Sequence, residues 1–243
     1  MADKKTDALR EKLTFKPRNV FFSNTDFSLC DSFAEDYKSF IATGKTGRLC
    51  VKEAVAIAEA AGFVPYSRKM KLSAGDKVYK ICHGKAIVFA HIGKKPLSEG
   101  VNITAAHIDV PCLDLKQMPL YESEGLALFK THYYGGIKKY QWTAVPLSLH
   151  GVVVKADGSK VDVRIGDDEK DPCFVVTDLL PHLAGEQSKR TLSDGIRGEE
   201  LNVLVGSRPF KDDEESQLVK LNIMNILNEK YGIVETDFLS AEL

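Results

Sequence analysis

The sequence contains few cysteines, and none of the five stands in a Cys-x-x-Cys pair. An odd number of scattered cysteines suits neither a disulfide framework nor a zinc ribbon, so we expect free thiols in a reducing, cytoplasmic compartment. Apolar runs are also short, and the polar first residues lack the apolar core of a signal peptide. We therefore expect no membrane partner.

The chain also has no excess of positive or negative charge. The chain has 33 basic and 34 acidic residues, for a formal net charge of −1. A protein with this balance has no overall field to attract nucleic acid or anionic lipid, so we expect no nucleic-acid partner. We find no internal repeat and no low-complexity tract. At 243 residues and 44% hydrophobic content, the chain can bury a sizeable core.

One stretch carries the main chemical signal. Small and β-branched residues from Val101 to Ala106 predict a buried strand, and this strand would deliver His107 and Asp109 to its C-terminal end before Pro111. Residues two apart on a strand share a face, so both side chains can reach one site. Imidazole is a common metal ligand, and a neighbouring carboxylate fixes its tautomer.

The His107–Asp109 pair also has a purely structural interpretation. Composition alone places about 0.8 acidic residues two positions after a histidine somewhere in a chain like this one. A hydrogen-bonded pair at the end of a strand needs no metal. Taken by itself, the spacing therefore leaves both interpretations open.

Periodicity predicts the elements around this stretch. Helices are expected at about 28–43 and 47–61, with apolar stripes that predict core packing, followed by a hairpin of 78–82 and 86–92. The first stripe consists of Cys30, Phe33, Tyr37, Phe40 and Ile41.

After Pro111 the pattern changes to short strands. These are expected at about 126–134, 147–155, 161–165 and 173–177, and the Asp157-Gly158 pair predicts a type I′ turn. A short helix at 178–184 and a strand at 201–205 follow. The last helix is predicted from Asp213 to Lys230, with Leu218, Leu221, Met224, Leu227 and Tyr231 on its buried face, and then a strand from 233 to 243. The acidic run at 212–215 suits a solvated helix start better than a metal cluster.

Three motifs in order resemble those of the aspartyl aminopeptidase family of two-zinc exopeptidases. They are Ala106-His107-Ile108-Asp109-Val110-Pro111, the stretch Thr131 to Trp142 that contains Tyr134-Gly135-Gly136, and Asp178-Leu179-Leu180-Pro181-His182-Leu183-Ala184. The stretch from Leu201 to Ser207 resembles the bacterial branch of the family. Several ordered motifs over most of a chain are far more specific than one His–Asp pair.

The resemblance implies an α/β fold in which residues 1–111 form the N-terminal part of a catalytic domain. Residues 112–243 would be an inserted β-rich dimerisation domain, apparently cut at its last strand. By motif, His107 would be a metal ligand and Asp109 the catalytic-site carboxylate that orients it, while His182 would be a substrate-binding residue. Some members carry a further histidine one turn on that reaches a neighbouring subunit, but Glu186 stands there in this chain.

The resemblance further implies a zinc-dependent aminopeptidase, with two zinc ions per complete site or other divalent metals, a peptide substrate and homo-oligomers formed through the inserted domain. The family's remaining acidic and histidine ligands lie beyond the insert, and Glu199-Glu200 lacks their context. We therefore expect this chain to carry only the first part of an active site. The alternative is a non-catalytic oligomerisation or binding module, and the coding sequence after Leu243 would discriminate between the two.

Overall fold

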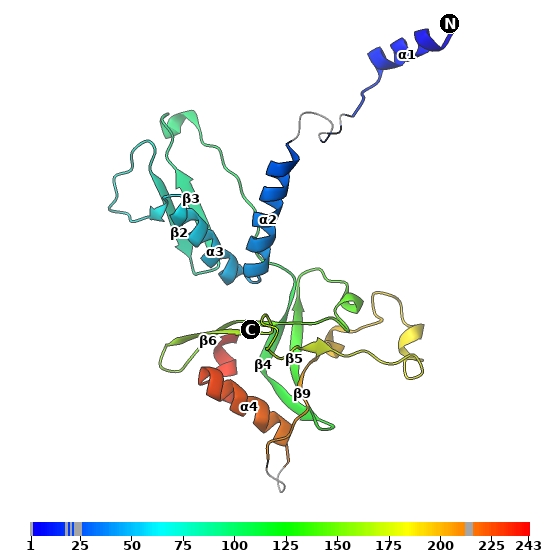
Figure 1. The fold of residues 1–243 in the computed structure, drawn as a ribbon. Helices are drawn as coiled ribbons and strands as arrows, with labels where there is room; N and C mark the ends of the chain where they lie inside the picture. Colours follow the sequence, from blue (N-terminus) through cyan, green and yellow to red (C-terminus); the bar gives the residue numbers. More distant parts are fainter. Residues whose placement is uncertain (1, 18, 20, 22–25, 212–215) are drawn as a thin grey trace. The chain divides into compact units, whose positions relative to one another are not determined.

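The computed structural model describes residues 2–17, 19, 21, 26–211 and 216–243 (Figure 1). The chain divides into two compact units, Met1–Thr43 and Gly44–Leu243. Within the described residues, no helix is both long enough and apolar enough to cross a membrane. Helices and sheets occur together, which confirms the predicted α/β class.

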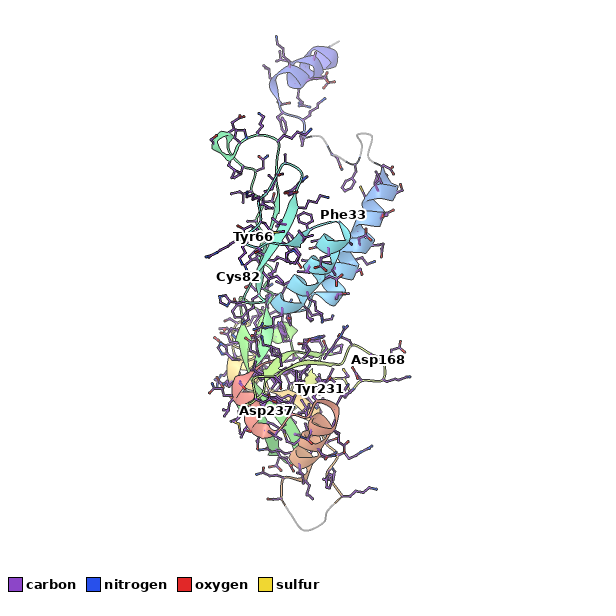
Figure 2. All side chains as sticks on the ribbon, turned by 90° about the vertical axis from the view of Figure 1, so that its left-hand side faces the viewer. Phe33, Tyr66, Cys82, Asp168, Tyr231 and Asp237 are labelled. Carbon is purple, nitrogen blue, oxygen red and sulfur yellow. The ribbon has the colours of Figure 1, made fainter. Side chains whose placement is uncertain are left out.

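The described part of the first unit contains the α-helices α1 (Ala2–Leu13) and α2 (Phe27–Thr43). The helix expected at 28–43 is therefore confirmed, but the prediction that its apolar stripe is core is wrong, because α2 has no buried residue. Phe33, labelled in Figure 2, is 73% exposed. A helix buries its stripe only where another element packs on it, and periodicity alone does not supply that element.

The second unit contains the remaining helices and all described strands. They are α3 (Gly47–Ala60), β1 (Val64–Pro65), β2 (Lys77–Cys82), β3 (Ala86–His91), η2 (Leu97–Glu99), β4 (Cys112–Ser123), β5 (Leu126–Tyr134), η3 (Lys139–Gln141), β6 (Leu149–Val154), β7 (Lys160–Ile165), β8 (Val175–Val176), η4 (Gln187–Lys189), η5 (Gly198–Glu200), β9 (Val203–Gly206), α4 (Leu218–Tyr231), η6 (Glu235–Ser240) and β10 (Ala241–Glu242). The described strands form three sheets, in the orders β1-β2-β3, β10-β6-β7 and β4-β5-β9-β8.

Helix α3 and the β2–β3 hairpin confirm the predictions for this region. The side chain of Thr46 caps α3 by accepting a hydrogen bond from the backbone N–H of Leu49 (3.2 Å). Val51 and Ala58 of the predicted stripe are buried, together with Cys50, whereas Ala61 at its end is exposed, so the stripe packs as core in part. The hairpin pairs antiparallel from Lys77↔His91 to Cys82↔Ala86.

The β-rich part of the second unit has the larger core. Strand β5 occupies the range predicted from the sequence, whereas its 12-residue partner β4 was not predicted. The two pair antiparallel from Cys112↔Tyr134 to Ser123↔Leu126, with an irregularity between Leu115 and Leu120. The buried residues of this core come from both β-rich sheets, from α4 and η6, and from connecting segments: Leu120, Ala127, Phe129, Val153, Val163, Ile165, Phe174, Val176, Ile196, Leu201, Val203, Val219, Leu227, Ile233 and Phe238.

Several predictions in this part need correction. The turn between β6 and β7 is not type I′, because that turn needs two residues with positive φ and here only Gly158 has one (+82°). The Asp157 carboxylate instead accepts a hydrogen bond from the backbone N–H of Ser159 (2.8 Å). The helix expected at 178–184 is instead a turn at 181–183. Residues 233–243 form mainly η6 rather than a strand, and there Asp237, labelled in Figure 2, accepts from the N–H of Val234 (2.9 Å).

Helix α4 starts later than predicted, at Leu218 rather than Asp213. Residue Gln217 adopts a left-handed conformation (φ +62°), which separates the helix from the residues before it. The predicted C-terminal stop is confirmed, because Gly232 has a φ of +63°. The buried residues of α4 are Val219 and Leu227, so only Leu227 of the predicted face is fully buried. The acidic run at 212–215 lies outside the described residues.

Candidate functional site

The segment that carries His107 and Asp109 is not a strand. Residues 101–111 form no ladder with any strand of the described chain, and Val101 and Ile103 are 62% and 82% exposed. The prediction of a buried strand at 101–106 is therefore wrong for this structure. A β-strand is completed by a neighbour that takes up its backbone hydrogen bonds, and composition does not show whether that neighbour is present.

His107 and Asp109 nevertheless lie side by side. The Nδ1 atom of His107 is 3.0 Å from the backbone carbonyl oxygen of Asp109 and 3.5 Å from its carboxylate Oδ1. Both neighbours are acceptors, so they favour the tautomer with the proton on Nδ1. The Nε2 lone pair then faces outward from a side chain that is 85% exposed. Nε2 makes no hydrogen bond within the described residues, so this nitrogen is free to bind an electrophile.

The Asp109 carboxylate has a second partner, which sequence reasoning did not identify. The hydroxyl of Tyr134 donates a hydrogen bond to its Oδ2 atom (3.0 Å), and this bond raises the pKa of the tyrosine above its ordinary value. Tyr134 reaches Asp109 because the last residue of β5 pairs with Cys112, the first residue of β4. The Tyr-Gly-Gly motif contains this residue, but its pairing with the His–Asp segment was not visible in the sequence.

The adjacent Cys112 thiol is chemically quiet. Its Sγ atom donates to the Asp114 carboxylate (3.3 Å), and burial together with this bond raises the pKa of the thiol to about 12. A thiol with that pKa stays protonated at neutral pH, so it is a poor nucleophile and a poor metal ligand. All five cysteines are free in the structure, as the sequence predicts.

The third predicted site residue, His182, lies in the turn at 181–183 and is exposed. It forms no hydrogen bond or ion pair with His107, with Asp109 or with any other described residue. The leucines around it, Leu179, Leu180 and Leu183, are 54%, 59% and 65% exposed. Among the described residues, His107 therefore contacts Asp109, whereas His182 contacts neither of them.

The donor set is incomplete for a zinc site. Within the described residues, no group of three or more His, Cys, Asp or Glu side chains is arranged to hold a metal ion. Glu199 and Glu200 are engaged in ion pairs instead of being arranged around a common site. Lys116 pairs with Glu199 (2.6 Å), and Arg190 pairs with Glu200 (3.0 Å). The Nε2 atom of His107 fits one zinc ligand, whereas a zinc site in a protein takes three or four.

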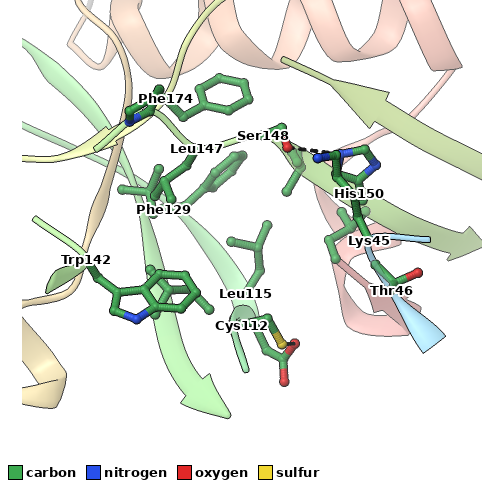
Figure 3. Close-up of a pocket in the computed structure, with 16 residues that line it drawn as sticks. Lys45, Thr46, Cys112, Leu115, Phe129, Trp142, Leu147, Ser148, His150 and Phe174 are labelled. Atoms are coloured by element: carbon green, nitrogen blue, oxygen red, sulfur yellow. Dashed lines mark hydrogen bonds between the residues drawn. The ribbon is translucent and has the colours of Figure 1, made fainter. Parts of the chain in front are cut away.

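A separate cavity of about 280 Å³ lies close to β4 and β6 (Figure 3). On one side it is lined by apolar residues, and on the other by polar ones that include His150. The ring nitrogen Nε2 of His150 is 3.0 Å from Ser148 Oγ and 3.1 Å from Asp167 Oδ1, while Nδ1 has no partner within the described chain. Burial lowers the pKa of this histidine, although Asp167 opposes the shift. The labelled lining residues are Lys45, Thr46, Cys112, Leu115, Phe129, Trp142, Leu147, Ser148, His150 and Phe174.

Comparison with known proteins gives consistent matches. The chain is 51% identical over 232 residues to a probable M18 family aminopeptidase 1 of Clostridium acetobutylicum, an alignment that covers 93% of this chain and 50% of that protein. The crystal structure of an M18 family aminopeptidase from Thermotoga maritima superimposes with a TM-score of 0.87 at 41% identity, over 94% of this chain and 50% of that one.

A more distant structure, the mApe1 dodecamer of S. cerevisiae, shares the fold alone, at 18% identity and a TM-score of 0.57 over 84% of this chain and 45% of that one. The chain thus spans about half the length of the relatives it matches. The family model described as aminopeptidase I zinc metalloprotease (M18) matches residues 40–243, most of the chain. On these grounds, the chain belongs to the M18 family of aminopeptidase I zinc metalloproteases.

Proposed function

We propose that this chain contributes one zinc ligand, His107, and its orienting carboxylate, Asp109, to a zinc-dependent aminopeptidase that removes N-terminal residues from peptides. The observation that carries the proposal is that both neighbours of His107 Nδ1, the carbonyl and the carboxylate of Asp109, are acceptors. Asp109 holds the proton on Nδ1, which leaves the exposed Nε2 lone pair available for a metal. The family is described as a zinc metalloprotease, which fits a histidine prepared in this way.

The remaining zinc ligands and the base would come from the half of the relatives that this chain does not cover. A zinc hydrolase needs several protein ligands and a group that takes the proton of the attacking water. The described residues supply one ligand nitrogen, so no catalytic step can be derived from them alone. The boundary between a catalytic part at 1–111 and an inserted β-rich part at 112–243 belongs to the same proposal.

We further propose that residues 112–243 mediate self-association and that the protein works in the cytoplasm. Exposed leucines around His182 support an assembly surface, since contiguous exposed apolar side chains commonly mark interfaces. A relative of the same fold is a dodecamer, as its description states. Five free cysteines suit a reducing compartment. His182 would contact the substrate, and His182→Ala would then raise KM more than it lowers kcat.

The test compares the chain with a completed protein, meaning this chain joined to the half of a relative that it does not cover. We expect the chain alone to bind zinc weakly and to leave aminoacyl p-nitroanilides intact. The completed protein should bind zinc and hydrolyse them, and His107→Ala should abolish turnover. The matched control is His91→Ala, because His91 is also exposed and lies in β3. Hydrolysis by residues 1–243 alone, or a zinc-free and inactive completed protein, would refute the proposal.

A further inference from the structure

We propose that Tyr134 is a positioning residue for His107: its phenol holds the Asp109 carboxylate, and Asp109 in turn holds the imidazole. This inference rests on the proposed zinc-binding role of His107. It adds a residue that lies outside the His-x-Asp motif, 25 positions further along the chain. Tyr134 would then link the β-rich part of the protein to the metal ligand through Asp109.

The contacts form a chain of three groups. The Tyr134 hydroxyl donates to Oδ2 of Asp109 at 3.0 Å, and Oδ1 of the same carboxylate lies 3.5 Å from Nδ1 of His107, next to the Asp109 backbone carbonyl oxygen at 3.0 Å. Each carboxylate oxygen therefore has a different partner. A carboxylate held at one oxygen only can still rotate about its side-chain bonds, whereas a second hydrogen bond limits that rotation. Such outer partners fix the orientation of a ligating imidazole.

The need for this support follows from the backbone around Asp109. Residues 101–111 pair with no strand of the described chain, so no ladder fixes the direction of the Asp109 side chain. The Asp109 side chain is 60% exposed, and packing cannot fix it either. Precise ligand geometry requires neighbours whose own positions are locked. Among the described side chains, Tyr134 is the one that donates a hydrogen bond to this carboxylate.

Tyr134 itself stands on a fixed element. It is the last residue of β5 and pairs with Cys112 in the β4–β5 ladder. The next residue, Gly135, has a φ of +81°, and a Cβ atom there would lie 3.6 Å from the Cα atom of Pro111. The chain therefore turns close against Pro111 directly after Tyr134. This turn keeps the end of β5 beside the segment that contains His107 and Asp109.

The neighbouring tyrosine provides a matched control. Tyr133 and Tyr134 project to opposite faces of β5, because successive residues of a strand alternate. The Tyr133 ring stacks on His132 with 5.7 Å between ring centroids, and its hydroxyl makes no hydrogen bond within the described residues. Tyr134 is 47% exposed, so loss of its hydroxyl leaves no buried cavity. Tyr134→Phe and Tyr133→Phe therefore differ mainly in the contact with Asp109.

The first measurement uses the 243-residue chain and reads the tautomer of His107 by long-range ¹H–¹⁵N NMR of the imidazole. We expect the wild-type chain to carry the proton on Nδ1. The backbone carbonyl of Asp109 still accepts from Nδ1 in the variant, so Tyr134→Phe should shift His107 only part of the way toward the Nε2–H tautomer, and Tyr133→Phe should leave the spectrum unchanged. An unchanged His107 tautomer in Tyr134→Phe would overturn the inference.

The second measurement uses the completed protein and determines its zinc affinity by competition with a chelator. We expect Tyr134→Phe to weaken zinc binding by about 10-fold, the lower end of the usual range for outer-shell partners. Excess zinc should restore turnover, a rescue that general misfolding would not allow. A wild-type zinc affinity in Tyr134→Phe would also overturn the inference. If the wild-type completed protein binds no zinc, the proposed function fails, and the tautomer measurement alone decides the role of Tyr134.

Discussion

The buried histidine beside the cavity should make the stability of the second unit depend on pH. The His150 side chain is 6% exposed, its Nε2 atom is shared between Ser148 and Asp167, and its Nδ1 atom has no partner within the described residues. A second proton would place an unpaired N–H and a charge in this buried site, near the cationic side chains of Arg164 and Lys45. Burial therefore lowers the pKa of His150 in the folded chain below its ordinary value of 6.5.

The sign of the effect follows from proton uptake. Above the unfolded pKa both states carry a neutral histidine, so the residue contributes no pH dependence there. Below it the unfolded chain binds a proton that the folded chain resists, and the free energy of unfolding falls until the lower folded pKa is reached. Between about pH 7.5 and about pH 5.5 the loss is at most about 1.4 kcal/mol, which is one tenfold change in the unfolding equilibrium.

Urea unfolding followed by fluorescence measures this loss, because Trp142 is the single tryptophan and lines the same cavity. In a thermal scan, 1.4 kcal/mol corresponds to a fall in Tm of about 3–5 °C for a protein of this size. His150→Gln removes the titrating group and should flatten the dependence, while His91→Gln, at an exposed position, should leave it intact. A stability that stays constant over this range in the wild type, or a dependence that survives His150→Gln, would refute the reasoning.

Three further predictions concern packing, hydrogen bonding and thiols. Phe238 is 3% exposed and packs edge-on against Phe129 with 5.8 Å between ring centroids. Phe238→Ala should therefore lower the free energy of unfolding, measured in urea, by about 3–5 kcal/mol. The control Leu239→Ala, at an exposed position, should lower it by less than about 0.5 kcal/mol. Thr131 is 3% exposed and donates to the backbone carbonyl of Leu201, so Thr131→Val should cost about 1–3 kcal/mol by leaving that oxygen unpaired, and an unchanged urea midpoint would contradict this. Denatured, non-reduced protein should contain five titratable thiols, and a count of three or fewer in fresh material would contradict the free state of the cysteines.

Local signals in the sequence were sufficient where one stretch of residues decides the structure. The helix before Gly62, the hairpin around His83-Gly84 and strand β5 combine clear periodicity with turn residues at their ends. The predicted start of α4 failed because Gln217, just before the first helical residue, adopts a left-handed conformation that no composition signal marks. Residues 233–243 contain two apolar pairs, Ile233-Val234 and Phe238-Leu239, separated by three polar residues, and a 3-10 helix with a capping carboxylate, Asp237, forms there instead of a strand.

The same distinction applies to the candidate site, where a contact between near neighbours in the sequence was predictable and a contact between distant residues was not. The prediction that His107 and Asp109 lie together is confirmed because the contact spans only two residues, although the strand on which that prediction rested does not form. The contact of Tyr134 with Asp109 depends on the register of β4 with β5, and β4 itself was not predicted. Register follows from how two strands pack and turn, which a single stretch of sequence does not contain. His182 remains a prediction, since the described residues of one chain do not bring it to His107.

The ends of the segment from Leu115 to Leu243 lie side by side. The backbone N–H of Leu115 donates to the carbonyl of Leu243 (2.9 Å), and Glu242 is bound by Arg48 (2.9 Å) and Lys85 (2.7 Å) next to it. A polypeptide that leaves and returns at one point imposes little stretch on its host, and each doubling of such a loop costs only about 0.6 kcal/mol of closure entropy. Under the domain boundary proposed above, the segment would be exchangeable: a short turn, or a foreign domain with neighbouring termini, would fit at the same two positions while α3 and the β2–β3 hairpin keep their fold.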